Sequence, residues 1–262
     1  MRARSMVEAR RVALVTFAAL ALLWGSVPLA AEQAATLHWA ARVELGLPVS
    51  GTVRAVEVRE GERVKRGQVL VRLDARGYEA AVARAKARMA SQEEALAEAE
   101  REAERAEELY ERTVLSDHEL HVAKIAFARA KAEYAAAQAE LVQSELNLEY
   151  SVLRAPFDAV VLRRMVEPGQ AIASGLQVTP LLVLAQDGRM VARAQAGEEV
   201  VGRLTRGAQV PVRVAGQRFD GQVRHVGLEP AEAGGYAVDV EFDYDPNRVT
   251  LRAGQSGQVD LP

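Results

Sequence analysis

Residues 76–151 carry the clearest pattern in the chain and read RGYEAAVARAKARMASQEEALAEAEREAERAEELYERTVLSDHELHVAKIAFARAKAEYAAAQAELVQSELNLEYS. In each half, large apolar residues recur every seven positions, with a second apolar set at the complementary heptad position. In the first half these are Val82, Met89, Leu96, Ala103 and Tyr110, with Tyr78, Ala85, Ala99 and Ala106. In the second half they are Leu120, Phe127, Tyr134, Leu141 and Leu148, with Ala123, Ala130 and Ala137. Each half predicts a helix with one apolar stripe, and pairing the two stripes would bury both.

The two predicted helices are separated at residues 113–117. The β-branched pair Thr113 and Val114 interrupts a run of strong helix formers, and Ser116 with Glu119 three residues later fits a capping box. Arms of about 35 residues would form an antiparallel rod on the order of 50 Å long, because a helix rises about 1.5 Å per residue.

The sequences on either side of the rod predict short strands punctuated by glycine. The stretch 49–74 carries Val64, Gly67, Gln68 and Leu70, and the stretch 153–187 repeats this order as Val166, Gly169, Gln170 and Ile172. The hairpin is therefore expected as an insertion in one split β-domain. Five further strands between Met190 and Leu261, joined by a strand at Thr36–Leu45, predict a small barrel.

The flanking half-motifs resemble a biotinyl/lipoyl-type domain. The spacing Arg-x3-Leu-x6-Ser in RAEELYERTVLS, formed by Arg105, Leu109 and Ser116, resembles the hairpin-tip motif of the periplasmic adaptor proteins (membrane fusion proteins) of tripartite efflux pumps. The strand pattern after residue 190, ending in LRAGQSGQVDL, is similar to the adaptor β-barrel. The resemblance runs from about Val43 to Leu261, in the family's domain order.

This resemblance implies a mixed α and β fold, in which a long antiparallel α-helical coiled-coil hairpin is inserted in a split lipoyl-like β-domain that a small β-barrel follows. The expected parts are a signal peptide or membrane anchor (1–31), a linker with the first barrel strand (32–48), the first lipoyl-like half (49–75), the hairpin (76–151), the second lipoyl-like half (152–187) and the barrel (188–262). Larger adaptors carry an additional membrane-proximal domain, which is not expected here.

The resemblance also implies a function. The protein would be a periplasmic adaptor that links an inner-membrane transporter, with the resistance-nodulation-division type favoured, to an outer-membrane channel, and its lipoyl-like units would pack into a homo-oligomeric ring. Arg105, Leu109 and Ser116 would dock on the channel. Two alternatives stay open, namely an adaptor of an ABC-type or secretion-type exporter and a coiled-coil envelope scaffold without a transport role.

Composition and motifs exclude several other classes of function. The 262 residues include 33 basic and 36 acidic side chains, so no basic field is present to bind nucleic acid, and cysteine is absent. No nucleophile elbow, P-loop, dinucleotide fingerprint or zinc-protease motif is present, so we expect no enzyme activity and no cofactor.

Two further kinds of site, a carrier lysine and a histidine metal site, are not expected in this chain. A lipoyl-type carrier needs a lysine at a hairpin apex, where this chain has the rod instead, and Lys65 lies in the turn before Gly67. His118 and His121 could hold a metal ion at the tip, but polar residues at an exposed turn are the better interpretation, and we expect no metal site.

The first 31 residues read as an export signal. Arginines at positions 2, 4, 10 and 11 precede an apolar run from Val12 to Trp24, and small residues follow at Ala30 and Ala31. The segment is also just long enough to remain as a membrane anchor. In either case the rest of the chain would be exported, which predicts a periplasmic protein attached to or facing the inner membrane of a Gram-negative bacterium.

Overall fold

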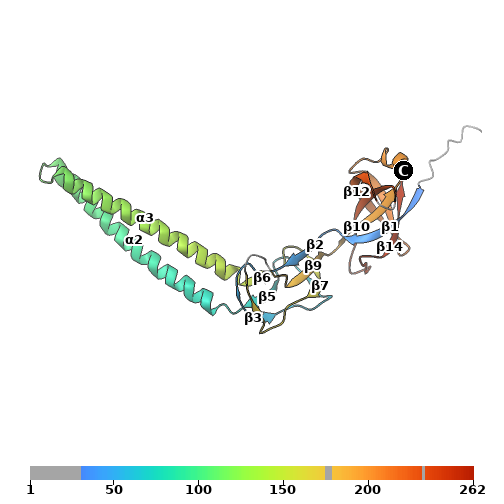
Figure 1. Cartoon of the computed structure of the whole chain (residues 1–262), viewed down its shortest axis with the longest axis horizontal. Helices are drawn as coiled ribbons and strands as arrows, with labels where there is room; N and C mark the ends of the chain where they lie inside the picture. The colour runs from blue at the N-terminus through green and yellow to red at the C-terminus, as the bar shows by residue number, and fades with distance from the viewer. Residues whose placement is uncertain (1–30, 175–178, 232–233) are drawn as a thin grey trace, which may run out of the picture. The chain divides into compact units, whose positions relative to one another are not determined.

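The computed structural model describes residues 31–174, 179–231 and 234–262 (Figure 1). The chain divides into two compact units, residues 41–187 and the residues up to 40 together with 188–262. Nearly all of the expected targeting segment, residues 1–30, lies outside the described residues. Within the described ranges, no helix combines the length and the apolar character that crossing a bilayer requires.

Two long helices, α2 (Arg76–Glu111) and α3 (Asp117–Glu149), occupy the central part of the sequence. Both are rich in alanine and glutamate, and α2 also in arginine, residues that favour helix. The helices run side by side (Figure 1), and ion pairs between them show that they are antiparallel. Lys86 near the start of α2 pairs with Glu145 near the end of α3, and Glu107 near the end of α2 pairs with Lys124 near the start of α3.

The buried residues of the helix pair lie at heptad positions. They are Val82, Ala85 and Ala106 on α2 and Leu120, Ala130 and Ala137 on α3. Two positions depart from the predicted stripe. Tyr110, expected in it, is 41% exposed and lies one residue before the end of α2. Gln92 occupies the heptad position between Ala85 and Ala99, and its side-chain oxygen Oε1 is buried without a hydrogen-bond partner.

The β-part of the same unit consists of two four-stranded sheets. One has the order β2 (Arg42–Leu45), β9 (Leu182–Gln186), β7 (Ala159–Arg164) and β4 (Arg63–Val64), and the other has the order β6 (Val152–Arg154), β5 (Val69–Leu73), β3 (Gly51–Val56) and β8 (Ala171–Ile172). Their shared core includes Leu70, Leu73, Val161, Leu181 and Leu184. Because β4 pairs with β7 and β5 pairs with β6, strands that precede the helices and strands that follow them build one core.

The start of α2 and the end of α3 are held together by the sheet that contains β5 and β6. α2 follows β5 and α3 leads into β6, and the Leu73 amide donates to the Ser151 carbonyl at 2.9 Å. Hydrogen bonds from the Arg76 guanidinium and backbone N–H fix Asp74 at the start of α2 and lower its pKa to about 2. A helix of 36 residues rises on the order of 50 Å, so the turn between the helices lies far from the sheet.

The second unit is a closed barrel with the order β1 (Ala31–Trp39), β10 (Arg189–Ala196), β13 (Tyr236–Asp243), β12 (Gln217–Pro230), β11 (Gln209–Val214) and β14 (Ser256–Leu261). A short helix, α4 (Glu198–Val201), follows β10. The barrel core includes Leu37, Met190, Val212, Val240 and Phe242.

The single strand expected over residues 36–45 was wrong, because the structure has two strands there in two different units. β1 pairs with β10 and β14 in the barrel, whereas β2 pairs with β9 in the other unit. Leu37 belongs to the barrel core, and Val43 and Leu45 pack on the other core. All three have odd residue numbers, so apolar and polar residues alternate without a break from β1 to β2. The alternation therefore gives no sign that the chain passes from one sheet to another.

Candidate docking site at the helical tip

The last turn of α2 ends in a tight reversal. The Thr113 amide donates to the Tyr110 carbonyl at 2.8 Å, and the Val114 amide donates to the Leu109 carbonyl at 2.9 Å. This pair of bonds is the Schellman pattern, which needs a left-handed residue and usually has glycine there. Thr113 takes that position with φ 59°, a conformation that costs a residue with a Cβ about 1–2 kcal/mol. The reversal is therefore well defined and slightly strained.

The first turn of α3 begins with the expected capping box. The Ser116 hydroxyl accepts from the Glu119 amide at 3.3 Å, and the Glu119 carboxylate accepts from the Ser116 amide at 3.0 Å and from its hydroxyl at 2.7 Å. These hydrogen bonds, that of the hydroxyl first, lower the pKa of Glu119. The Ser116 hydroxyl has one lone pair left, so an external partner could only donate a hydrogen bond to it.

Arg105 projects from α2 about two turns before the reversal. Its side chain is 64% exposed and pairs with Glu102 one turn earlier on the same helix. An exposed pair of this kind contributes only about 0.2–0.5 kcal/mol. The guanidinium carries five donors, so it can exchange Glu102 for acceptors on a partner, or bind both.

Leu109 is partly buried, and four other apolar residues in the last turns of α2, the reversal and the first turns of α3 are more exposed. Tyr110 is 41% exposed and Val114 is 71% exposed, while on α3 Val122 and Ile125 are 52% and 65% exposed. Of these residues only Tyr110 belongs to the heptad pattern, because that pattern describes the stripe between the helices. The sequence did contain a signal, since Val122 and Ile125 are two β-branched apolar residues three positions apart, on the face of α3 directed away from its stripe.

Neither of the other sites weighed from the sequence gains support from the geometry. His121 lies 3.8 Å from Asp117, but no group of three or more metal-ligating side chains occurs among the described residues. Lys65 pairs with Asp158 at 3.1 Å in a loop-to-loop contact. The Arg66 backbone and the Lys65 side chain, which both donate to Asp158, lower the pKa of that carboxyl.

The chain is similar to several known proteins. It is 28% identical over 161 residues to the multidrug resistance protein MdtA of Pantoea ananatis, which corresponds to 62% of this chain and 39% of that protein. It is 29% identical over 138 residues to MdtA of Cronobacter turicensis, or 53% of this chain and 33% of the relative. The chain thus spans between one third and two fifths of the length of these relatives.

Solved structures share the fold. A MacA–MexA chimeric protein, which contains the α-hairpin domain of Pseudomonas aeruginosa MexA, superposes with a TM-score of 0.65 at 21% identity, covering 88% of this chain and 81% of the chimera. The membrane fusion protein Spr0693 of Streptococcus pneumoniae superposes with a TM-score of 0.66 at 14% identity, covering 88% and 98%.

Residues 42–181, more than half of the chain, match the family described as CzcB-like, barrel-sandwich hybrid domain. This range contains both sheets of the split β-domain and the inserted helices. The chain therefore belongs to the CzcB-like barrel-sandwich hybrid family.

Proposed function

We propose that this chain is the adaptor subunit of a tripartite efflux pump, which bridges an inner-membrane transporter to an outer-membrane channel. One observation carries the proposal. Two antiparallel helices leave a barrel-sandwich hybrid domain through paired strands and place a capped turn on the order of 50 Å from that domain. The names of the relatives, multidrug resistance proteins, support an efflux role.

Each part of the chain would have its own role in the assembly. The helical hairpin (76–151) reaches the channel, the two lipoyl-like halves (49–75 and 152–187) pack side by side into a homo-oligomeric ring, and the barrel (188–262) faces the transporter. The resistance-nodulation-division type of transporter is favoured. The N-terminal segment (1–31) directs the protein to the periplasm and, if it is uncleaved, holds it on the inner membrane.

At the tip, three residues would make the docking contacts. Arg105 would cap carbonyl or carboxylate acceptors on the channel, since its planar fork suits such groups. Leu109, which is already partly covered, would add at most about 1.5–3 kcal/mol on complete burial, and the exposed Val114 next to the turn would extend the apolar contact. Ser116 would accept one hydrogen bond. Repetition around a symmetric ring would multiply these modest contacts.

Leu109→Ser and Arg105→Asp test this proposal in a strain that lacks its own adaptor. Both variants should lose efflux complementation and cross-linking to the channel, while the far-UV circular dichroism stays unchanged. A photo-reactive residue at Val114, which is 71% exposed, serves for the cross-linking.

Matched controls separate docking from general effects on the helices. Arg129→Asp removes an exposed arginine that pairs with Glu133 on α3, and Val142→Ser removes an exposed apolar residue far from the tip. Both controls should retain drug tolerance. Normal tolerance in the Leu109 and Arg105 variants would overturn the docking role. A wild-type protein that cross-links to no channel would favour the envelope scaffold instead.

A further inference from the structure

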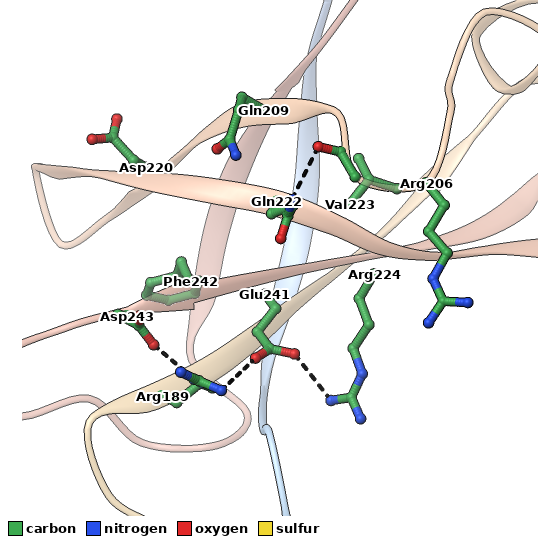
Figure 2. A pocket seen from close by; sticks show the side chains of 11 residues that line it. Arg189, Arg206, Gln209, Asp220, Gln222, Val223, Arg224, Glu241, Phe242 and Asp243 are labelled. Atoms are coloured by element: carbon green, nitrogen blue, oxygen red, sulfur yellow. Dashed lines mark hydrogen bonds and ion pairs between the residues drawn. The ribbon is translucent and has the colours of Figure 1, made fainter.

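The outer surface of the barrel carries a groove of about 540 Å³ with a polar lining (Figure 2). Side chains from β10, β12 and β13, from the start of β11 and from the turn before it line the groove, among them Arg189, Arg206, Gln209, Gln222, Arg224 and Glu241. Neither the heptad pattern nor the tip motif concerns this surface, so the groove needs its own explanation.

The backbone of the groove is fixed by close packing at Gly221 on β12. A Cβ at this position would lie 2.6 Å from Val240 Cγ1 and 2.7 Å from Val212 Cγ2, so only glycine fits there. Because side chains alternate along a strand, Asp220 and Gln222 on either side are directed outward into the groove. Gln222 Nε2 then donates to the Gly207 carbonyl at 3.2 Å, which ties the turn carrying Arg206 to β12.

The charged side chains in the groove differ in how many ion-pair partners they have. Glu241 lies 3.1 Å from the Arg189 guanidinium and 3.2 Å from that of Arg224, and Arg189 also contacts Asp243 at 2.7 Å. Two arginines therefore share one carboxylate. Arg224 uses the same nitrogen, Nη1, for Glu241 and for a 3.2 Å hydrogen bond to the Ala40 carbonyl, which leaves its Nε and Nη2 as spare donors. The side chain of Arg206 makes no ion pair or hydrogen bond within the described part of the chain, and Figure 2 shows it extended on the same side as Arg224.

We propose that this groove binds one carboxylate side chain from a mixed-charge surface of a protein partner, with Arg206 and Arg224 as its ligands. One additional carboxylate would give Arg206 the partner that it lacks and use the free donors of Arg224. Arg189, Arg206 and Arg224 are balanced by Asp220, Glu241 and Asp243, so the lining has no net charge. A densely anionic surface such as a lipid bilayer would be repelled by those three acids, whereas one carboxylate on a mixed-charge protein surface would not.

Nuclear magnetic resonance of the arginine side chains in the full-length protein tests this proposal. The probes are a capped peptide Gly-Glu-Gly-Glu-Gly, its glutamine counterpart, inorganic phosphate, and vesicles of phosphatidylglycerol and phosphatidylcholine. We expect saturable shifts of the Arg206 and Arg224 Nε signals with the glutamate peptide alone. Arg206→Ala should weaken that binding about fivefold, the amount expected for one exposed charge-assisted contact.

Two further variants make the result decisive. Arg218→Ala removes an exposed arginine on the same strand outside the groove and should leave the affinity unchanged. Arg206→Glu should abolish binding of the glutamate peptide and favour a lysine peptide of the same length. Equal binding by the wild type and by the Arg206 variants would overturn the proposal. A preference for phosphate or anionic vesicles over the peptide would also overturn it, because the ligand would then be a phosphate group.

Discussion

Replacement of Gln92 by methionine should stabilise the helix pair. Gln92 lies on the stripe of α2 between the buried residue Ala85 and the tip, and its Oε1 is buried with no hydrogen-bond partner. Arg88, one turn earlier, pairs with Glu140, which places Gln92 at about the level of the buried Ala137 on α3. The amide thus faces an apolar layer of the seam, where nothing satisfies its oxygen.

The expected gain follows from the cost of leaving a polar group unpaired. A buried acceptor without a partner costs about 1–3 kcal/mol, and the lower end applies here because Gln92 as a whole is only partly buried. Methionine has a similar length, adapts to irregular gaps and matches glutamine in helix propensity, so neither packing nor propensity should offset the gain. For a protein of this size, each kcal/mol of added stability raises the melting midpoint by about 2–4 °C. A gain of about 1 kcal/mol should therefore raise the midpoint of helix melting by about 2–4 °C.

Thermal unfolding followed by circular dichroism at 222 nm measures this effect. The control is Gln138→Met, the same substitution at an exposed position of α3, which should change stability by less than about 0.5 kcal/mol. A melting midpoint that is lowered or unchanged in the Gln92 variant would refute the reasoning. It would mean that the amide finds a partner in solution, or that the seam does not tolerate the thioether.

Three more outcomes follow from the geometry. Thr113→Gly should stabilise the tip by about 0.5–1 kcal/mol, seen as slower hydrogen exchange there, because glycine adopts φ 59° without strain although it adds entropy to the unfolded chain. Gly221→Ala should destabilise the barrel by about 1–3 kcal/mol in near-ultraviolet melting, because the new Cβ would collide with Val240. Lowering the pH should fray the start of α3. Hydrogen bonds from Ser116 hold the pKa of Glu119 below its usual value of 4.5. Their contribution to the stability of this turn is therefore complete above pH 4.5 and is lost as the pH falls through the lowered pKa. The amide signals of the first turn of α3 would report this loss.

The helix pair was largely predictable because its signals are local. A seven-residue repeat states which face of each helix is apolar, and Ser116 with Glu119 marks where α3 begins, whatever the rest of the chain does. The prediction is incomplete at Tyr110, which lies in α2 one residue before its end but is 41% exposed. A repeat describes which face of a helix is apolar and does not state how much of each side chain the partner helix covers.

Only part of the candidate tip site could be predicted from the sequence. Arg105, Leu109 and Ser116 were identified by their spacing, and the capping box of Ser116 with Glu119 was predicted, but the pairing of Arg105 with Glu102 was not. The structure shows Arg105 paired with Glu102 and the Ser116 hydroxyl engaged in its own cap. The pairing of Arg105 depends on rotamers and on exposure, which spacing along the chain does not specify.

By itself, the sequence determined the elements whose evidence lies within a few turns or a few strand residues: the two helices, the cap of the second, the glycine turns and most of the strands. Only the tertiary structure decided which strands are neighbours. It split residues 36–45 between two sheets, paired strands from either side of the helices, and gathered Arg189, Arg206 and Arg224 into one groove. The physical reason is that alternation along a strand specifies which side chains face inward, whereas the choice of partner strand depends on backbone hydrogen bonds and packing between residues far apart in the chain.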